Sequence, residues 1–185
     1  MQNLVNNRTI KHHIFHKLSD VVLKNKKKFT IENISKELDK SNKMYRSYPS
    51  KIILCNLLDV HSVDIETIDF TRSFVKNIEQ ENSVKCNIFA YYPPNGIIDW
   101  HTNENIPHWN AICTFSANGD SFFEYLKNKQ QIKVYDTKGW SVKLIKWTNA
   151  EPLVWHRAVS NTDRITVTFS SPNKIDVENF IKKII

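Results

Sequence analysis

Two histidines far apart in the chain stand in segments with the composition of β-strands. His101 lies in IIDWHTN, where Asn103 follows it two positions later, and His156 lies in PLVWHRAV. If residues 101 and 103 end an extended strand, their side chains point to the same face, because side chains alternate along a strand. Two imidazoles and one oxygen on one face form a facial ligand set, which leaves three positions of an octahedral iron open.

An arginine strengthens this pattern. Either histidine alone would more often be a hydrogen-bonded core residue than a metal ligand. Arg164, however, opens the next strand-like segment, RITVTFSS, eight residues after His156. Arg157 is the competing arginine, but it points to the opposite face of the strand from His156. The two histidines, Asn103 and the following arginine predict a facial metal site.

Other histidines are weaker candidates for metal binding. His12 and His16 are spaced by one helical turn, which suits two ligands, but no third ligand is apparent and a solvated face is expected. His108 follows the first candidate segment closely, and we expect it at the surface.

The first part of the chain, residues 1–82, is expected to be helical support. Apolar residues recur at spacings of three and four in RTIKHHIFHKLSDVVLKN, in TIENISKELDK and in DIETIDFTRSFVKNIEQ, which predicts amphipathic helices. The second of these stretches has Ile31, Ile34 and Leu38 in its stripe. Pro49 interrupts the chain between the helices, and a short apolar segment follows from Ile52 to Leu58.

From Ser83 onward the chain consists of short segments rich in β-branched and aromatic residues. Turn sequences such as PPNG, ANGD, DTKG and SNTD separate them, which predicts a sandwich or barrel of strands over residues 83–172. Residues 173–185 return to helical spacing, with Asn173 as the expected N-cap. We expect a single α+β domain over residues 1–185, with the N-terminal helices packed on the outer face of the sheet.

The segment YPPNGIIDWHTNEN resembles the tyrosine-to-metal segment of AlkB-type Fe(II)/2-oxoglutarate-dependent oxygenases. The resemblance to this superfamily, which includes prolyl-hydroxylase-like members, covers roughly residues 83–171. It implies a double-stranded β-helix (jelly roll) core, with Fe(II) and 2-oxoglutarate as cofactors. By this resemblance the metal ligands are His101, Asn103 and His156.

The resemblance also implies the cosubstrate site. Arg164 would form a bidentate salt bridge to the distal carboxylate of 2-oxoglutarate, and Thr166 would hydrogen-bond the same group. Tyr92 would line or bind the cosubstrate pocket. Trp100, Trp109 and Trp155 flank these positions in sequence and would provide a dry wall.

Three positions depart from the family pattern. Asn103 stands where a carboxylate is usual, and Ser170 and Ala90 stand where the AlkB repair enzymes have an arginine and an asparagine. Asn103 has three alternatives: it ligates through its amide oxygen, it leaves the position to water or chloride, or a neighbouring acid (Asp99 or Glu104) replaces it. An amide leaves the site more positive than a carboxylate and lowers the affinity for a hard cation.

These features predict an oxygenase that oxidises a C–H bond of an unidentified substrate, by hydroxylation or demethylation, and releases succinate and CO2. A halogenase-type variant and a non-catalytic metal- or ligand-binding jelly roll are the alternatives. The substrate class stays open between small molecules, protein side chains and nucleic acid.

Composition sets further expectations. The formal charge of +7 favours contact with polyanions such as nucleic acid, although Lys-, Asn- and Ile-rich usage also reflects AT-rich codons. No glycine-rich phosphate loop occurs, and the three cysteines form no CxxC pair. The N-terminal residues lack the apolar region of a signal peptide, so we expect a cytoplasmic protein with no membrane partner.

Overall fold

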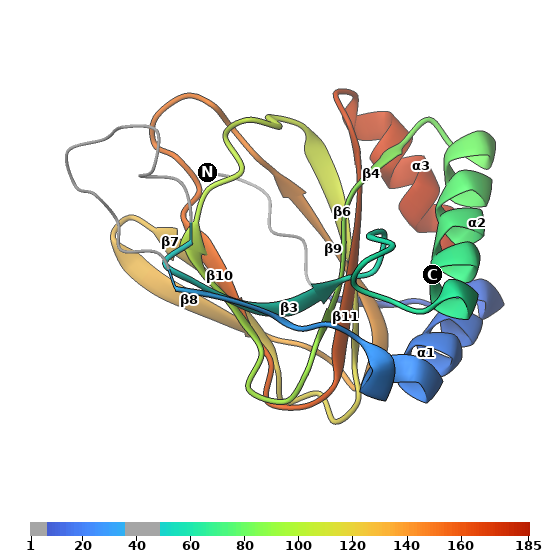
Figure 1. The fold of residues 1–185 in the computed structure, drawn as a ribbon. Helices are drawn as coiled ribbons and strands as arrows, with labels where there is room; N and C mark the ends of the chain where they lie inside the picture. Colours follow the sequence, from blue (N-terminus) through green and yellow to red (C-terminus); the bar gives the residue numbers. More distant parts are fainter. Residues whose placement is uncertain (1–6, 36–48) are drawn as a thin grey trace.

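The computed structural model describes residues 7–35 and 49–185. Its strands form one strongly curled antiparallel sheet (Figure 1), in which the strands follow the order β1-β9-β6-β11-β4-β3-β5-β10-β7-β8, with β2 paired to β3. This is the jelly-roll topology expected from the sequence. One half of the sheet consists of β1 (Arg8–Thr9), β9 (Gly139–Lys146), β6 (Trp109–Ser116), β11 (Arg164–Ser171) and β4 (Lys85–Tyr92).

The other half faces it across the interior. It consists of β5 (Ile97–His101), β10 (His156–Val159), β7 (Phe122–Lys127) and β8 (Gln130–Tyr135). Strand β3 (Lys51–Asn56) joins the two halves, because its first residues pair with β5 and its last two pair with β4. The strands of both halves therefore present one set of alternate side chains to a shared interior.

Alternation along the first half of the sheet separates an apolar outer face from a more polar inner face. In β11, Ile165, Val167 and Phe169 belong to the core beneath the helices. The intervening Arg164 and Thr166 point inward and are buried as well. The apolar face of this half of the sheet packs against the helices, so the face toward the interior carries the polar side chains.

Three helices cover the outer face, on the right of the sheet in Figure 1. They are α1 (His13–Asn25), followed by a 3-10 turn η1 (Lys26–Lys28), α2 (Ile65–Glu81) and α3 (Lys174–Ile184). Asp64 caps α2 by accepting a hydrogen bond from the backbone N–H of Thr67. The ring of Phe15 in α1 makes edge contacts with Trp140 in β9 and Phe74 in α2, so the two helices and the sheet share one core.

We expect the substitution Ile165→Val to lower the free energy of unfolding by about 0.5–1.5 kcal/mol, because it removes one methylene from a fully buried site. Chemical denaturation measures the effect. Ile175→Val is the matched control, since Ile175 in α3 is 56% exposed and should change stability by less than about 0.5 kcal/mol. Equal losses in the two variants would contradict this packing of β11.

The expectation of a purely helical first part was wrong. Residues Glu32–Ser35, which the sequence predicts as the start of a helix, form strand β2 and pair with β3, and the apolar segment that begins at Ile52 is part of β3. The spacing of three favours a helix, but the segment is short, and pairing with β3 supplies the backbone hydrogen bonds that make it a strand. Leu38, the third residue of the predicted stripe, lies outside the described residues.

Candidate metal centre

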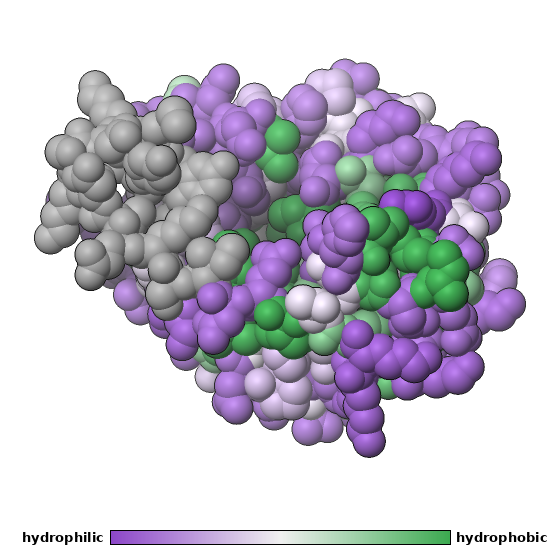
Figure 2. Space-filling view, in the orientation of Figure 1, coloured by the Kyte–Doolittle hydropathy of each residue, from purple (hydrophilic) through white to green (hydrophobic). Residues whose placement is uncertain are grey.

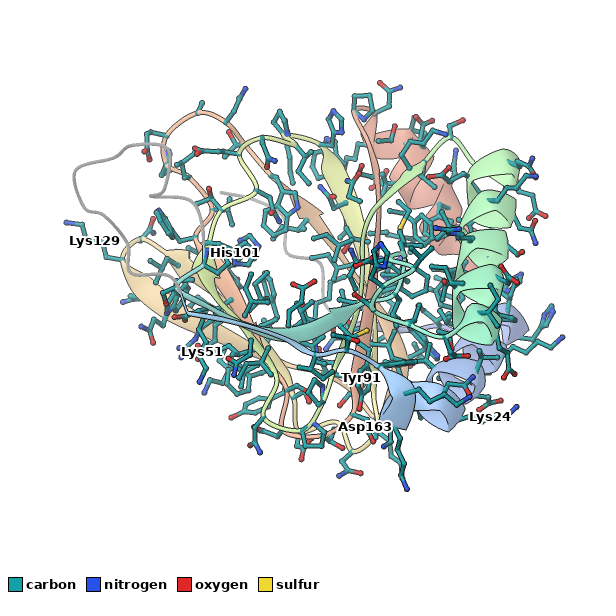
Figure 3. The ribbon with its side chains drawn as sticks, viewed as in Figure 1. Lys24, Lys51, Tyr91, His101, Lys129 and Asp163 are labelled. Carbon is teal, nitrogen blue, oxygen red and sulfur yellow. The ribbon has the colours of Figure 1, made fainter. Side chains whose placement is uncertain are left out.

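The two candidate histidines lie opposite each other on neighbouring strands. His101 ends β5 and His156 begins β10, and the two residues are direct partners in the antiparallel pairing of these strands. Their ring centroids are 4.1 Å apart, and both side chains are buried. Figure 3 shows His101 in the part of the barrel away from the helices.

Both imidazoles have the tautomer that a metal ligand needs. Nδ1 of His101 lies 2.7 Å from the carbonyl oxygen of Asp99, and Nδ1 of His156 lies 2.9 Å from that of Val154. A carbonyl only accepts, so each Nδ1 donates its proton and each Nε2 keeps a free lone pair. Burial lowers the pKa of both histidines, and that of His156 lies well below its ordinary value, which keeps both rings neutral.

Asn103 reaches the same point from the loop after β5. Its Nδ2 lies 3.2 Å from Nε2 of His156. Because Nε2 carries a lone pair in this tautomer, the Asn103 amide donates to it. A rotation of the amide about its Cβ–Cγ bond would present the oxygen instead, so the side chain is within reach of a cation bound by His156.

Neither acidic neighbour, Asp99 or Glu104, joins the two histidines. Asp99 accepts a hydrogen bond from Ser50 and lies near Arg157, and Glu104 does not line the cavity that contains the histidines. Within residues 7–35 and 49–185, no three histidine, cysteine, aspartate or glutamate side chains lie together as a metal-binding group, so Asn103 is the third side chain beside the two histidines. The donor set is two imidazoles and one amide, which fits a divalent cation that accepts nitrogen ligands, with a weaker third ligand than a carboxylate.

All six residues predicted for the site line one cavity of about 350 Å³ between the two halves of the sheet. They are His101, Asn103, His156, Tyr92, Arg164 and Thr166. These residues come from β4, from β5 and the loop that follows it, from β10 and from β11, and the jelly roll brings them together. Their assignment as ligands of a metal and a cosubstrate stays a prediction.

Arg164 is held firmly at the cavity wall. Its Nε donates to Oδ2 of Asp136 at 2.7 Å, and one terminal nitrogen donates to Oγ1 of Thr166 at 2.6 Å. Its guanidinium carbon lies 5.1 Å from the centre of the Tyr92 ring. Lys143 pairs with the other oxygen of Asp136 at 2.7 Å. Although burial opposes ionisation, the charges of Arg164 and Lys143 hold the pKa of Asp136 below its ordinary value.

The turn before Arg164 is also fixed. Asp163 accepts a hydrogen bond from the hydroxyl of Tyr91 at 2.6 Å and forms an ion pair with Lys26 of η1. Figure 3 shows Tyr91 and Asp163 close together near the start of β11. Burial and the Asp163 carboxylate raise the pKa of Tyr91, so its hydroxyl stays protonated as the donor. The helical layer thus fixes where β11 begins.

The apolar wall of the cavity beside His156 consists of residues other than the tryptophans predicted from the sequence. Trp147 stacks on the His156 ring with centroids 4.2 Å apart, and Phe123 and Ile112 complete this part of the lining. The three predicted tryptophans do not line the cavity: the ring of Trp100 packs under Arg157, and Lys146 and Lys174 lie over that of Trp109. Proximity in sequence misled here, because adjacent strand residues point to opposite faces; Trp155 is likewise adjacent to His156.

Sequence reasoning also missed Asp136 and Lys143. Ser141, Lys143 and Ile145 are alternate residues of β9 and lie on its inner face. This alternation was the sequence signal from which the inward position of Lys143 could have been predicted. The competitors of the predicted site are accounted for: Arg157 pairs with Glu124, and His12 caps α1. His108 does not line the cavity.

Comparisons with known proteins give only distant likenesses. No family model matches the chain, and no curated protein matches it. Among solved structures it is similar to a prolyl-4-hydroxylase from Pseudomonas putida, at 10% identity and a TM-score of 0.46 over 89% of this chain and 90% of that one. It is also similar to a 2OG-Fe(II) oxygenase family oxidoreductase from Burkholderia pseudomallei, at 11% and 0.44 over 84% and 78%.

A third similar structure is a protein described as a predicted oxalate decarboxylase from Thermotoga maritima, at 15% identity and a TM-score of 0.36 over 78% of this chain and 93% of that one. Likenesses of this degree assign neither a family nor an activity. In the described part of the chain, no helix is long and apolar enough to cross a membrane.

Proposed function

We propose that this protein is a Fe(II)- and 2-oxoglutarate-dependent oxygenase that oxidises a C–H bond of its substrate. The observation that supports it is one cavity that joins two facing imidazoles, whose Nε2 lone pairs are not protonated, with that of His156 beside Asn103, to a buried arginine. Two neutral imidazoles suit Fe(II), and an arginine suits the distal carboxylate of a dicarboxylic acid.

Each residue has a defined task in this proposal. His101 and His156 hold the cation, and the carbonyls of Asp99 and Val154 fix the ring orientations. Asn103 supplies a third, neutral ligand. When bound, the iron and 2-oxoglutarate would supply the oxidation of the substrate by O2, with one oxygen atom going to the substrate and the other to succinate as CO2 is released.

The remaining lining orients the cosubstrate and excludes water. Arg164 and Thr166 anchor the distal carboxylate, and the Tyr92 ring packs against the guanidinium. Trp147 and Phe123 shield His156, which strengthens electrostatic interactions in the site. The substrate part of the cavity includes Ile52, Leu54 and Ile98, so we propose that an apolar portion of the substrate enters it. Small molecules, protein side chains and nucleic acid remain substrate classes to test.

Turnover without a known substrate tests this proposal. The purified protein is supplied with Fe(II), ascorbate, oxygen and 2-oxoglutarate, and succinate is measured. We expect slow succinate formation in the wild type and none above background in Arg164→Met. A wild type that forms no succinate, while it binds Fe(II) tightly, would favour the metal-binding alternative over an oxygenase.

We expect Thr166→Val to weaken 2-oxoglutarate binding by about tenfold, because the substitution removes the hydroxyl that fixes one terminal nitrogen of Arg164. Isothermal titration calorimetry on the metal-loaded protein under anaerobic conditions measures this affinity. Thr168→Val is the matched control, since Thr168 lines the same cavity two residues further along β11 and makes no side-chain hydrogen bond to Arg164. The same loss in both variants would indicate a general change of the strand.

A further inference from the structure

Three ionisable side chains from three elements form a buried cluster behind the cavity wall. Asp136 follows β8, Lys143 lies in β9 and Arg164 begins β11. Their side chains are almost fully buried, with exposed fractions of 0%, 1% and 2%. Only Arg164 of the three lines the cavity. The other two therefore act on a ligand in the cavity only through it.

The hydrogen bonds divide the Asp136 carboxylate between two partners. Oδ1 accepts from the Lys143 ammonium and Oδ2 accepts from Nε of Arg164, each at 2.7 Å. The backbone N–H of Asp136 donates to the carbonyl of Ser121, which fixes the position of the acid. Because Lys143 donates to one carboxylate oxygen, Asp136 accepts only one hydrogen bond from Arg164. Arginine and carboxylate otherwise favour a bidentate pair with two parallel hydrogen bonds.

This division leaves terminal Arg164 donors for a ligand. A guanidinium has five N–H groups. Asp136 uses the one on Nε, Thr166 uses one of the terminal four, and the Tyr92 hydroxyl is within hydrogen-bonding reach of another, so two terminal N–H groups remain for a ligand. A ligand carboxylate accepts two parallel hydrogen bonds from such an edge.

We propose that Asp136 and Lys143 are positioning residues for Arg164: Asp136 fixes the guanidinium through Nε, and Lys143 restrains Asp136 so that the terminal nitrogens stay available to a carboxylate ligand. This inference rests on the proposed function for the identity of the ligand, a dicarboxylic acid. Simple stabilisation explains the cluster poorly, because replacing buried ion pairs by apolar residues is often neutral or stabilising.

The test measures binding of two dicarboxylates to the full-length protein without metal. 2-Oxoglutarate and glutarate are titrated by calorimetry into chelator-treated protein; glutarate lacks the keto oxygen and reports on the carboxylate anchor alone. The single variant is Lys143→Met, which frees Oδ1 of Asp136 to compete for the terminal nitrogens of Arg164. The double variant adds Asp136→Asn, whose single amide oxygen still accepts from Nε but cannot form the forked pair.

We expect glutarate affinity to fall at least about tenfold in Lys143→Met and to return to within about threefold of the wild type in the double variant. A purely structural role predicts altered melting temperatures in both variants with unchanged glutarate affinity, and that result would overturn the positioning role. A double variant that binds as weakly as Lys143→Met would also overturn it.

The outcomes separate this inference from the proposed function. If the wild type binds glutarate and the variants behave as expected, but no succinate forms with Fe(II) and 2-oxoglutarate, the positioning role stands and the oxygenase proposal fails. If the wild type forms succinate and Lys143→Met binds glutarate normally, the oxygenase proposal stands and the positioning role fails. A wild type that binds neither dicarboxylate contradicts both.

Discussion

Replacing His156 with alanine is expected to weaken Fe(II) binding by at least about 100-fold, since losing groups that merely orient a ligand already costs about 10–100-fold. His156 is buried, with 4% of its surface exposed, and its ring packs against those of Trp147, Phe123 and His101, so the substitution removes one of the two imidazole ligands of the proposed site. Anaerobic titration of the metal-free protein with Fe(II), against a competing chelator, measures the affinity.

His108→Ala is the control for this loss. His108 lies on the loop between β5 and β6, close in sequence to Asn103, but it does not line the cavity. We expect its replacement to leave Fe(II) affinity unchanged within about twofold, well under the roughly 1.4 kcal/mol of a tenfold effect. Comparable losses from His108→Ala and His156→Ala would place the metal somewhere other than between β5 and β10.

Asn103→Asp is expected to change the metal-free and metal-bound proteins in opposite directions. In the metal-free state the Asn103 amide donates to the lone pair of His156, whereas an ionised aspartate cannot donate and would face that lone pair. At pH 8 we expect the metal-free melting temperature to fall by about 2–4 °C, which corresponds to about 1 kcal/mol in a chain of this length. With Fe(II), the added charge should tighten binding by about 10–100-fold.

Asn105→Asp is the matched control, because it makes the same change at an exposed position of the same loop. It should shift neither quantity beyond the error of measurement. Unchanged Fe(II) affinity in Asn103→Asp would show that position 103 is not a ligand. That result would favour the halogenase-type alternative, in which chloride or water fills this coordination position.

The sequence pattern predicted a sandwich or barrel, its family resemblance predicted the jelly roll, and six of the predicted residues line the cavity. Alternation in RITVTFSS placed Arg164 and Thr166 on one face, and the same rule placed Arg157 away from His156, as the ion pair of Arg157 with Glu124 shows. Period-two patterns are reliable where one face of a strand meets a helical layer, because a shift by one residue would exchange the apolar set beneath the helices with the polar set in the interior.

What the sequence could not supply was the partner of each inward residue. Trp147 stacks on His156, whereas Trp155, which directly precedes His156 in the sequence, does not line the cavity. The local sequence does not distinguish the two tryptophans, because the contact depends on β9 and β10 facing each other across the interior. Asp136 lies in a turn segment, DTKG, and its pairing with Lys143 and Arg164 depends on register between distant strands. The same lack of pairing information made residues 32–35 read as a helix when they pair with β3.

One region of the exposed surface is apolar. Figure 2 shows hydrophobic residues grouped on one face among hydrophilic ones, near the connection between β3 and α2. Val60 and Ile65, at 51% and 73% exposed, belong to this connection and the start of α2. The charge of +7 keeps nucleic acid among the partners to test.

The most direct measurement is the absorption spectrum of the anaerobic protein titrated with Fe(II) and then with 2-oxoglutarate. A chelated 2-oxo acid on Fe(II) gives a visible metal-to-ligand charge-transfer band. We predict that the band forms at one equivalent of iron, saturates with 2-oxoglutarate, disappears in His156→Ala and needs more cosubstrate in Arg164→Met. Failure of the band to form at saturating iron and 2-oxoglutarate, in protein that is folded by circular dichroism, would contradict a shared site for the metal and the cosubstrate.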